Sequence, residues 1–254
     1  MKYNFVFDKD FLDNKTFCLS NAERFVVLAA VAGGHNVALS GYHTERLVSA
    51  IKLLRDKDTP FVSIDSRIGY RELIGVKPDR GVVKHGFVTD ADGGMLHFSN
   101  LDYQDCAVKS WLETVMTNGC IKLCNNGITT LPAKFQLIAE NGIGSVTGMY
   151  RGRDIMFKCN EDAPRQFWTF TELRRQINMA KGNQHLRCAL DVKNRDIDNT
   201  HDLKLSSSAT NMVSEQSIEF DTLRLARTIA DIYGHRLTYC SDIAEAKRFQ
   251  NISE

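Results

Sequence analysis

The chain has 254 residues, of which 43% are apolar and 25% charged, a composition typical of a globular protein with a sizeable buried core. Its 32 basic residues balance 31 acidic ones, and the formal net charge of +1 excludes a global electrostatic attraction to nucleic acid or to an anionic membrane. The best apolar run, residues 25–32, is too short to span a bilayer, and the first residues turn acidic before a signal-peptide core could form. We therefore expect a cytoplasmic protein without a membrane span.

Helical and strand patterns alternate through the first part of the chain. Residues 21–32 form an apolar helical face, with Ser20 as a predicted N-cap and glycines at the end. The other predicted helices cover residues 47–54 and 104–117. Short apolar runs that suit buried strands cover residues 35–40, 60–65, 94–98 and 133–139. This alternation predicts an α/β fold with a mostly parallel sheet that is covered by helices on both faces.

Two further segments of this part have a different character. Residues 120–124 and 128–131 flank Asn125-Asn126-Gly127, which is a strong signal for a β-hairpin turn. Residues 72–93 combine glycines with charges and are expected to form a long exposed segment.

Helical patterns dominate after about residue 160. The predicted helices cover residues 168–181, 215–233 and 241–250, the last with Ser241 as its N-cap, and a polar stretch covers residues 191–208. We therefore predict an α/β domain at residues 1–160 and a smaller helical domain at residues 161–254.

The seven cysteines are scattered and odd in number, which is typical of free thiols in a reducing compartment. The nearest pair, Cys120 and Cys124, lies in an apolar stretch with no His or Cys partner at zinc spacing. We expect buried structural thiols there and no metal site.

Three segments in order resemble the AAA+ ATPases of the magnesium-chelatase type, including their competence-associated branch. Residues 33–41, GGHNVALSG, resemble the approach to a Walker A loop, and residues 132–139, PAKFQLIA, resemble the sensor-1 strand. Residues 223–232, LRLARTIADI, resemble the helix of the lid domain. The resemblance covers nearly the whole chain and implies a P-loop-type sheet domain followed by a helical lid.

The Walker A loop implied by this resemblance is degenerate. A working loop reads G-x-x-x-x-G-K-[ST], so that backbone N–H groups and a lysine bind the phosphates and a hydroxyl binds magnesium. Counting from Gly41, Arg46 replaces the second glycine, Leu47 the lysine and Val48 the hydroxyl residue. Glu45 adds a negative charge that would repel a triphosphate. Arg46 is a candidate cation in place of the missing lysine. In the alternative interpretation, Arg46 is a surface arginine in a closed loop.

The Walker B position is degenerate as well. In the family an apolar strand ends in Asp-Glu, which organises magnesium and polarises the attacking water. Here Ser99 stands at the Asp position and Asn100 at the Glu position, and neither carries a negative charge. His97 is a weak alternative base. The loss of both motifs predicts that ATP hydrolysis is absent.

Three further residues match nucleotide-contacting positions of the family. Asn141, or Gly142 if no residue is deleted, falls near the sensor-1 polar residue, and Arg224 and Arg227 match arginines of the lid helix that can reach a γ-phosphate. The alternative for the two arginines is a salt bridge at the helix surface. Gly41, Arg46, Asn141, Arg224 and Arg227 thus form the candidate degenerate nucleotide pocket.

The resemblance favours a catalytically degenerate AAA+ module that acts through protein assembly. Its expected partner is an AAA+ subunit of the same or a related type, in a homo- or hetero-oligomer, with no cofactor required. The alternatives are a sensor that binds ATP or ADP without turnover, a residual ATPase, and a scaffold or DNA-associated adaptor. Neutral net charge argues against the DNA adaptor.

Overall fold

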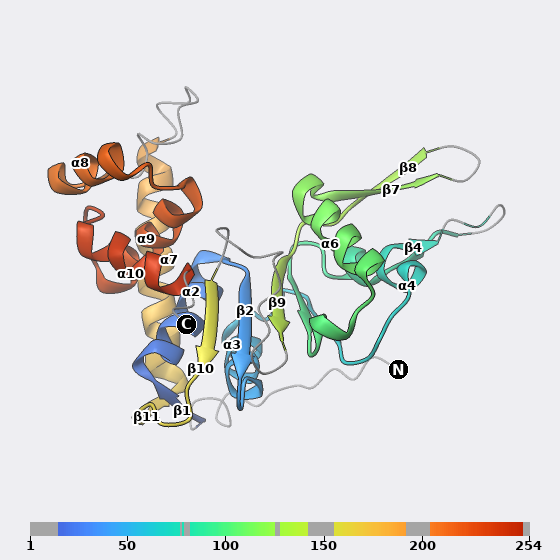
Figure 1. The fold of residues 1–254 in the computed structure, drawn as a ribbon, viewed down its shortest axis with the longest axis horizontal. Coiled ribbons are helices and arrows are strands. Elements are labelled where there is room, and N and C mark those ends of the chain that lie inside the picture. The colour runs from blue at the N-terminus through green and yellow to red at the C-terminus, as the bar shows by residue number, and fades with distance from the viewer. Residues whose placement is uncertain are drawn as a thin grey trace. The chain divides into compact units, whose positions relative to one another are not determined.

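A computed structural model describes residues 15–76, 78, 82–124, 128–141, 155–191 and 204–250, without the side chains of residues 184–191 (Figure 1). The chain divides into two compact units. The sheet unit contains residues 35–44 and 55–159, and the helical unit contains residues 1–34, 45–54 and 160–254. Both units are therefore assembled from separate stretches of sequence, and one boundary between them follows Cys159.

The sheet unit is built on a five-stranded, fully parallel sheet in the order β10-β2-β9-β6-β3 (Figure 1). Its strands are β2 (Val37–Gly41), β3 (Phe61–Ile64), β6 (Met95–Phe98), β9 (Gln136–Glu140) and β10 (Ile155–Cys159). The central strands carry its core, with Leu39, Leu96 and Leu137 fully buried. The α/β class and the parallel sheet are confirmed, as are the four predicted strands, whereas the edge strand β10 was not predicted from the sequence.

Residues 72–93 are more structured than the sequence predicted. They contain most of α4 (Tyr70–Ile74), the paired strands β4 (Gly75–Val76) and β5 (Lys84–His85), and α5 (Phe87–Asp90). Leu73 and Val88 are fully buried, so the prediction of an exposed segment is wrong here. Gly75 has φ +90°, and a Cβ atom there would lie 2.3 Å from the Lys84 carbonyl oxygen. Gly75 therefore permits close backbone pairing and does not mark a solvated loop.

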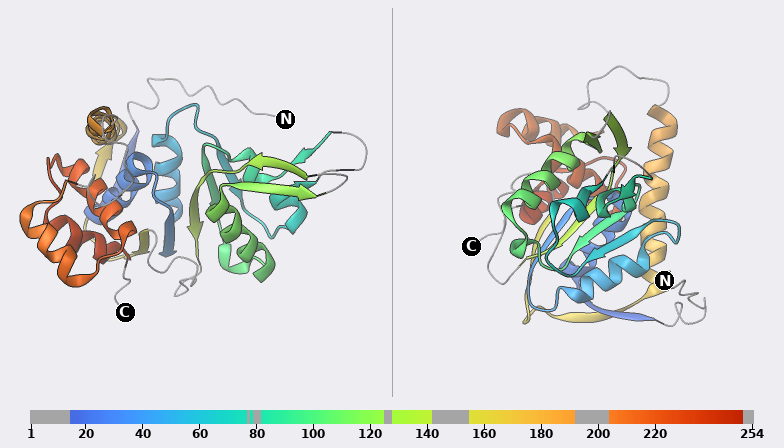
Figure 2. Two further views of the ribbon diagram at one scale, coloured as in Figure 1. Left: turned by 90° about the horizontal axis from the view of Figure 1, so that it is seen from above. Right: turned by 90° about the vertical axis from the view of Figure 1, so that its right-hand side faces the viewer.

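A helix and a hairpin complete the sheet unit. After a short 3₁₀ turn, η1 (Leu101–Tyr103), the helix predicted over residues 104–117 is present as α6 (Cys106–Asn118), which ends at Gly119 in the left-handed conformation. β7 (Cys120–Cys124) then pairs antiparallel with β8 (Ile128–Pro132), which confirms the predicted hairpin, although its turn at residues 125–127 lies outside the described residues (Figure 2).

The prediction that Cys120 and Cys124 are buried is wrong. Cys124 is exposed and Cys120 only half-buried, because strand alternation places Ile121 and Leu123 on the buried face of β7.

The helical unit begins with an antiparallel ribbon of β1 (Thr16–Ser20) and β11 (Arg165–Thr169), neither of which was predicted. Its helices are α2 (Asn21–Gly33), α3 (Glu45–Leu54), α7 (Phe170–Asp191), α8 (Ser207–Gln216), α9 (Phe220–Tyr233) and α10 (Cys240–Gln250). α2 packs against α3, α7 and α9, and the ring of Phe25 stacks on Phe249 with 4.6 Å between centroids.

Several predicted helix limits are wrong in this unit. α7 extends to Asp191, beyond the predicted end at residue 181, and α8 was not predicted. The helix expected over residues 215–233 begins only at Phe220 as α9, because Ser217 adopts the left-handed conformation at φ +47° and ends α8. Ser241 lies inside α10 and is not its N-cap, since the helix begins at Cys240. The Asp242 carboxylate reaches back from the first turn and accepts a hydrogen bond from the Tyr239 backbone N–H at 2.8 Å.

Within the described ranges, no helix has the length and apolar character needed to cross a membrane.

Candidate functional site

Gly41, the start of the candidate Walker A loop, is the last residue of β2. It has φ +90°, and a Cβ atom there would lie 2.6 Å from the carbonyl oxygen of Cys159 on the paired strand β10. Any side chain would therefore push the two strands apart. The pairing of β2 with β10 is enough to explain this glycine.

Thr44 follows Gly41 in the loop and is held by a carboxylate. Its hydroxyl donates a hydrogen bond to Oε2 of Glu140, the last residue of β9. The Thr44 residue is only 8% exposed, so this contact is largely shielded from water. An anionic oxygen thus lies against the loop where a phosphate binder would present positive or N–H groups.

Arg46 lies in the first turn of α3, in the helical unit, and is also bound by a carboxylate. Its guanidinium pairs with Oε1 of Glu23 at 3.0 Å. The Glu23 side chain is 1% exposed, and its Oε2 accepts a hydrogen bond from the Ser20 backbone N–H at 2.7 Å, which closes the capping box of α2. A second arginine, Arg165 at the start of β11, lies 3.5 Å from the same oxygen. Glu23 therefore neutralises the substitute cation of the loop.

The two eroded Walker B positions follow β6. Ser99 is half-buried, and its backbone N–H and its hydroxyl both donate to the carbonyl oxygen of Ile64, at 3.1 and 3.3 Å. Asn100 is exposed and precedes the turn of η1. Neither residue supplies the negative charge that would bind magnesium. The hydrogen bonds of Ser99 to Ile64 instead connect the end of β6 to the end of β3.

A polar relay runs across neighbouring strands of the same sheet. His97 on β6 is 5% exposed; its Nδ1 lies 2.9 Å from the hydroxyl of Ser63 on β3, and its Nε2 lies 2.8 Å from Oε1 of Glu140 on β9. The register explains the first contact, because Ser63 pairs directly with His97. With Thr44 on the other oxygen of Glu140, the relay reads Ser63–His97–Glu140–Thr44.

Sequence reasoning missed most of this relay. It treated His97 only as a weak alternative base and did not consider Ser63 or Glu140. The available signal was that His97 and Glu140 stand near the ends of two predicted strands, where parallel strands bring polar residues to one edge.

Asn141 follows β9 directly, and its backbone N–H donates to the Leu39 carbonyl oxygen at 2.8 Å. The residue is 7% exposed, and its side-chain Oδ1 is buried without a hydrogen-bond donor among the described residues. Gly142, the alternative sensor position, and the glycine-rich stretch at residues 142–148 lie outside the described residues.

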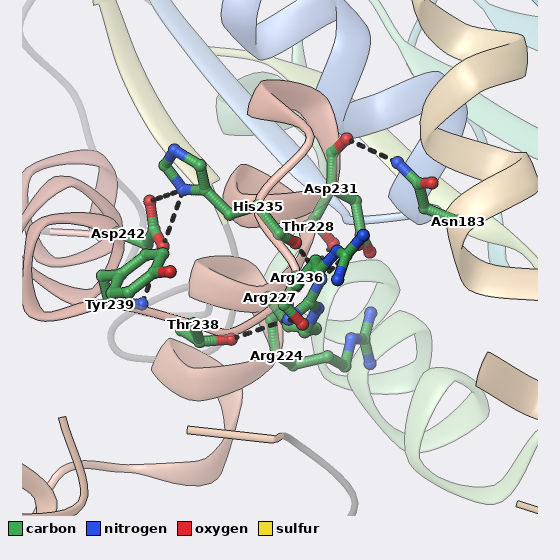
Figure 3. Close-up of polar contacts among 10 residues, drawn as sticks. All are labelled: Asn183, Arg224, Arg227, Thr228, Asp231, His235, Arg236, Thr238, Tyr239 and Asp242. Atoms are coloured by element: carbon green, nitrogen blue, oxygen red, sulfur yellow. Dashed lines mark hydrogen bonds and ion pairs between the residues drawn. The ribbon is translucent and has the colours of Figure 1, made fainter. Parts of the chain in front are cut away.

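Arg224 and Arg227 lie on α9 in the helical unit and differ sharply in their surroundings. Arg224 is exposed, whereas Arg227 is 8% exposed and pairs with Asp231 one turn along the helix at 2.6 Å. Figure 3 shows the guanidinium of Arg227 enclosed by the turn that follows α9. There it donates to the carbonyl oxygens of His235 at 2.9 Å and Arg236 at 3.4 Å. The geometry fits a structural clamp at the end of α9.

The same turn carries a second polar contact, between His235 and Asp242. Nδ1 of His235 lies 3.1 Å from the carboxylate of Asp242, which is 2% exposed and holds the start of α10 (Figure 3). Tyr233 lies beside it, with 5.8 Å between ring centroids, and burial followed by the charge of Glu245 raises the pKa of its hydroxyl. These contacts join α9 to α10.

The predicted site residues thus fall in both units. Gly41, Asn141, Ser99 and Asn100 lie in the sheet unit, and Arg46, Arg224 and Arg227 lie in the helical unit. Within the sheet unit, the ends of β2, β6 and β9 bring Thr44, His97 and Glu140 into contact. No group of three or more potential metal ligands gathers among the residues that the structure describes.

Comparison of the chain with protein-family models gives no match, and comparison with curated proteins gives none either.

Proposed function

We propose that the chain is a catalytically degenerate AAA+ module of the magnesium-chelatase type that acts through protein assembly and does not hydrolyse ATP. The resemblance of three ordered segments supports the family, and the parallel sheet is consistent with it. The Walker A, sensor-1 and Walker B positions follow β2, β9 and β6, three adjacent strands that point the same way. In parallel sheets, ligands bind at this carboxyl edge.

The proposal rests on two side chains of the loop that could contact a phosphate, because each of them already contacts a carboxylate. The Thr44 hydroxyl is bound to Glu140 and the Arg46 guanidinium to Glu23. A triphosphate bound at Thr44 would have to displace its contact with Glu140 and approach that carboxylate, and like charges at such short range repel strongly. The loop has no lysine to offset this cost.

We infer a role in assembly because the residues for ATP hydrolysis are missing while the rest of the chain still resembles an AAA+ domain. AAA+ domains form rings, and the chelatase group pairs an active subunit with an eroded one. The proposed partner is a second copy of this chain or a related AAA+ subunit.

A nucleotide sensor is the second candidate, and Asn141 favours it. Its amide is buried at the carboxyl end of β9, and its oxygen has no hydrogen-bond partner among the residues that the structure describes, although such groups usually have one. A bound ATP or ADP could supply that partner without hydrolysis.

Titration of ATP and magnesium into the purified full chain by calorimetry tests the proposal, alongside thermal unfolding with the same ligands. We expect no binding heat, no rise in melting temperature and no released phosphate. The assay is sensitive, because a ligand at 100 times its Kd would add about 2.7 kcal/mol to the free energy of unfolding. Sedimentation velocity over a range of concentrations should show self-association that magnesium and ATP leave unchanged.

Arg46→Ala is the matched variant. If the wild type binds ATP and this variant does not, the loop still holds nucleotide and the sensor replaces the pseudo-ATPase. Magnesium-dependent phosphate release that is absent from the variant would establish a residual ATPase. A chain that remains monomeric at every concentration would leave only a hetero-oligomeric partner.

A further inference from the structure

We propose that Ser63, His97 and Glu140 form a nucleophile–base–acid site that hydrolyses small carboxylic esters. The inference is independent of nucleotide binding, because it rests on side-chain contacts within the sheet unit alone. Three neighbouring parallel strands supply one residue each.

The geometry meets the requirements of an activated serine. The Ser63 hydroxyl lies 2.9 Å from Nδ1 of His97, and Nε2 of His97 lies 2.8 Å from Glu140. Nucleophile, base and orienting acid are thus each within hydrogen-bond distance of the next. Either imidazole nitrogen can serve as the base while the other donates, so the approach through Nδ1 leaves the chemistry unchanged.

The serine is exposed, and the side chains of the histidine and the glutamate behind it are largely buried. Ser63 is exposed to substrate, the His97 side chain is 6% exposed and the Glu140 side chain 13%. The Phe61 ring, two residues before the nucleophile, lies 5.9 Å from the His97 ring and limits its movement. Thr44 donates to Oε2 of Glu140 and leaves Oε1 to His97, which makes Thr44 a positioning residue.

The edge position of β3 supplies a donor for the developing oxyanion. The carbonyl oxygens of Pro60 and Ile64 accept hydrogen bonds from Met95 and Ser99 at the two ends of β6. Residues alternate in direction along a parallel strand, so the N–H of Ser63 points away from β6, toward the edge of the sheet where none of the described strands pairs with β3. A carbonyl attacked by Ser63 can place its oxygen against that N–H group.

The reaction balances with water as the only co-reactant. Ser63 Oγ attacks the ester carbonyl carbon, and its proton passes to His97 Nδ1 while Glu140 stabilises the imidazolium. The same proton then passes to the departing alkoxide, which leaves an acyl-Ser63 ester and an alcohol. Water, deprotonated by His97, attacks the acyl group, and a carboxylic acid leaves as Ser63 recovers its proton.

Asp65 competes with His97 for the serine. The Ser63 hydroxyl lies 2.8 Å from Oδ1 of Asp65, and a hydroxyl that donates to Asp65 cannot donate to His97. Asp65→Asn weakens this competing acceptor and should raise the rate of ester hydrolysis.

A fluorophosphonate probe followed by peptide mass spectrometry tests the site, with hydrolysis of p-nitrophenyl acetate measured in parallel. We expect the probe on Ser63 of the full chain. Ser63→Ala should abolish that label and lower hydrolysis to its rate in buffer, and Ser66→Ala, an exposed serine three residues along, should change neither. His97→Gln should lower hydrolysis by roughly 100-fold or more.

Variants of the buried relay need a check of folding by circular dichroism, whereas exposed Ser63 permits the decisive comparison without one. Glu140→Gln should lower kcat and leave KM unchanged, as expected of a group that orients the base. The inference is overturned if Ser63 carries no label or if Ser63→Ala hydrolyses the ester as fast as the wild type. Neither result bears on ATP binding, so this inference and the pseudo-ATPase proposal fail separately.

Discussion

Two arginines three residues apart show how little a local motif says about a side chain's role. Arg224 and Arg227 both belong to residues 223–232, which resemble the helix of the lid domain, and both were predicted as candidates for a phosphate contact. Arg224 is exposed, and Arg227 is buried with Asp231 and the carbonyl oxygens of the following turn. The buried ion pair with Asp231 is enough to explain why an arginine stands at position 227, without a phosphate contact.

The pair supplies a stability prediction. Arg227→Ala removes the ion pair between Arg227 and the Asp231 carboxylate, which is 2% exposed, and breaking a buried pair costs about 3–5 kcal/mol of unfolding free energy. Arg224→Ala should change that free energy by no more than about 0.5 kcal/mol, because it removes an exposed side chain. Urea unfolding followed by circular dichroism measures both, and equal effects would contradict the assignment of Arg227 as a clamp.

The candidate site was only partly predictable at this scale. The missing lysine and carboxylates could be counted from the residues, since each absence is local. The contacts that replace them could not: Thr44 meets Glu140 across 96 residues of sequence, and Arg46 meets Glu23 from another element. The type of a residue does not show which distant residues lie near it, so these contacts become visible only once the packing of the strands and helices is known.

At the scale of elements, the predictions succeeded where the signal was local. Ser20 and Glu23 form the capping box of α2, and Gly34 and Gly119 end their helices in the left-handed conformation. The missed strands β1, β10 and β11 have only five residues each and depend on partners distant in sequence. Their stability comes from pairing and burial, which short stretches of sequence do not reveal.

The unpredicted break between α8 and α9 supports an element-scale prediction. Ser217 ends α8 at φ +47°, where an L-residue with a Cβ atom is strained. Ser217→Gly should raise the free energy of unfolding by about 0.5–1 kcal/mol, and Ser217→Ala should give no gain because it keeps the Cβ. Chemical unfolding of both variants checks this, and equal stabilisation by glycine and alanine would contradict it.

At the scale of the whole molecule, neither unit corresponds to one continuous stretch. The helical unit combines α2 and α3 from the first part of the chain with α7 to α10 from the last, and its core includes the stacked pair Phe25 and Phe249. The sequence, read from one end to the other, places a boundary near residue 160 but does not show that earlier helices belong with later ones.

Cutting the chain at this boundary should therefore disrupt the helical unit. A fragment of residues 160–254 lacks α2, which packs against α7 and α9, and its exposed apolar faces should leave it without a cooperative unfolding transition. Circular dichroism with a urea titration tests this, and refolding it together with residues 1–159 should restore the transition. A cooperative transition in the isolated fragment would show that α2 and α3 are dispensable.

The stacking of Phe25 on Phe249 also sets an order of events during synthesis. All the segments of the sheet unit have left the ribosome soon after residue 159 is made, so its strands can pair while translation continues. α2 leaves the ribosome long before its partners α7, α9 and α10 are made. The part of its apolar surface that these helices cover must stay exposed until then, which makes α2 of the nascent chain a candidate for chaperone binding.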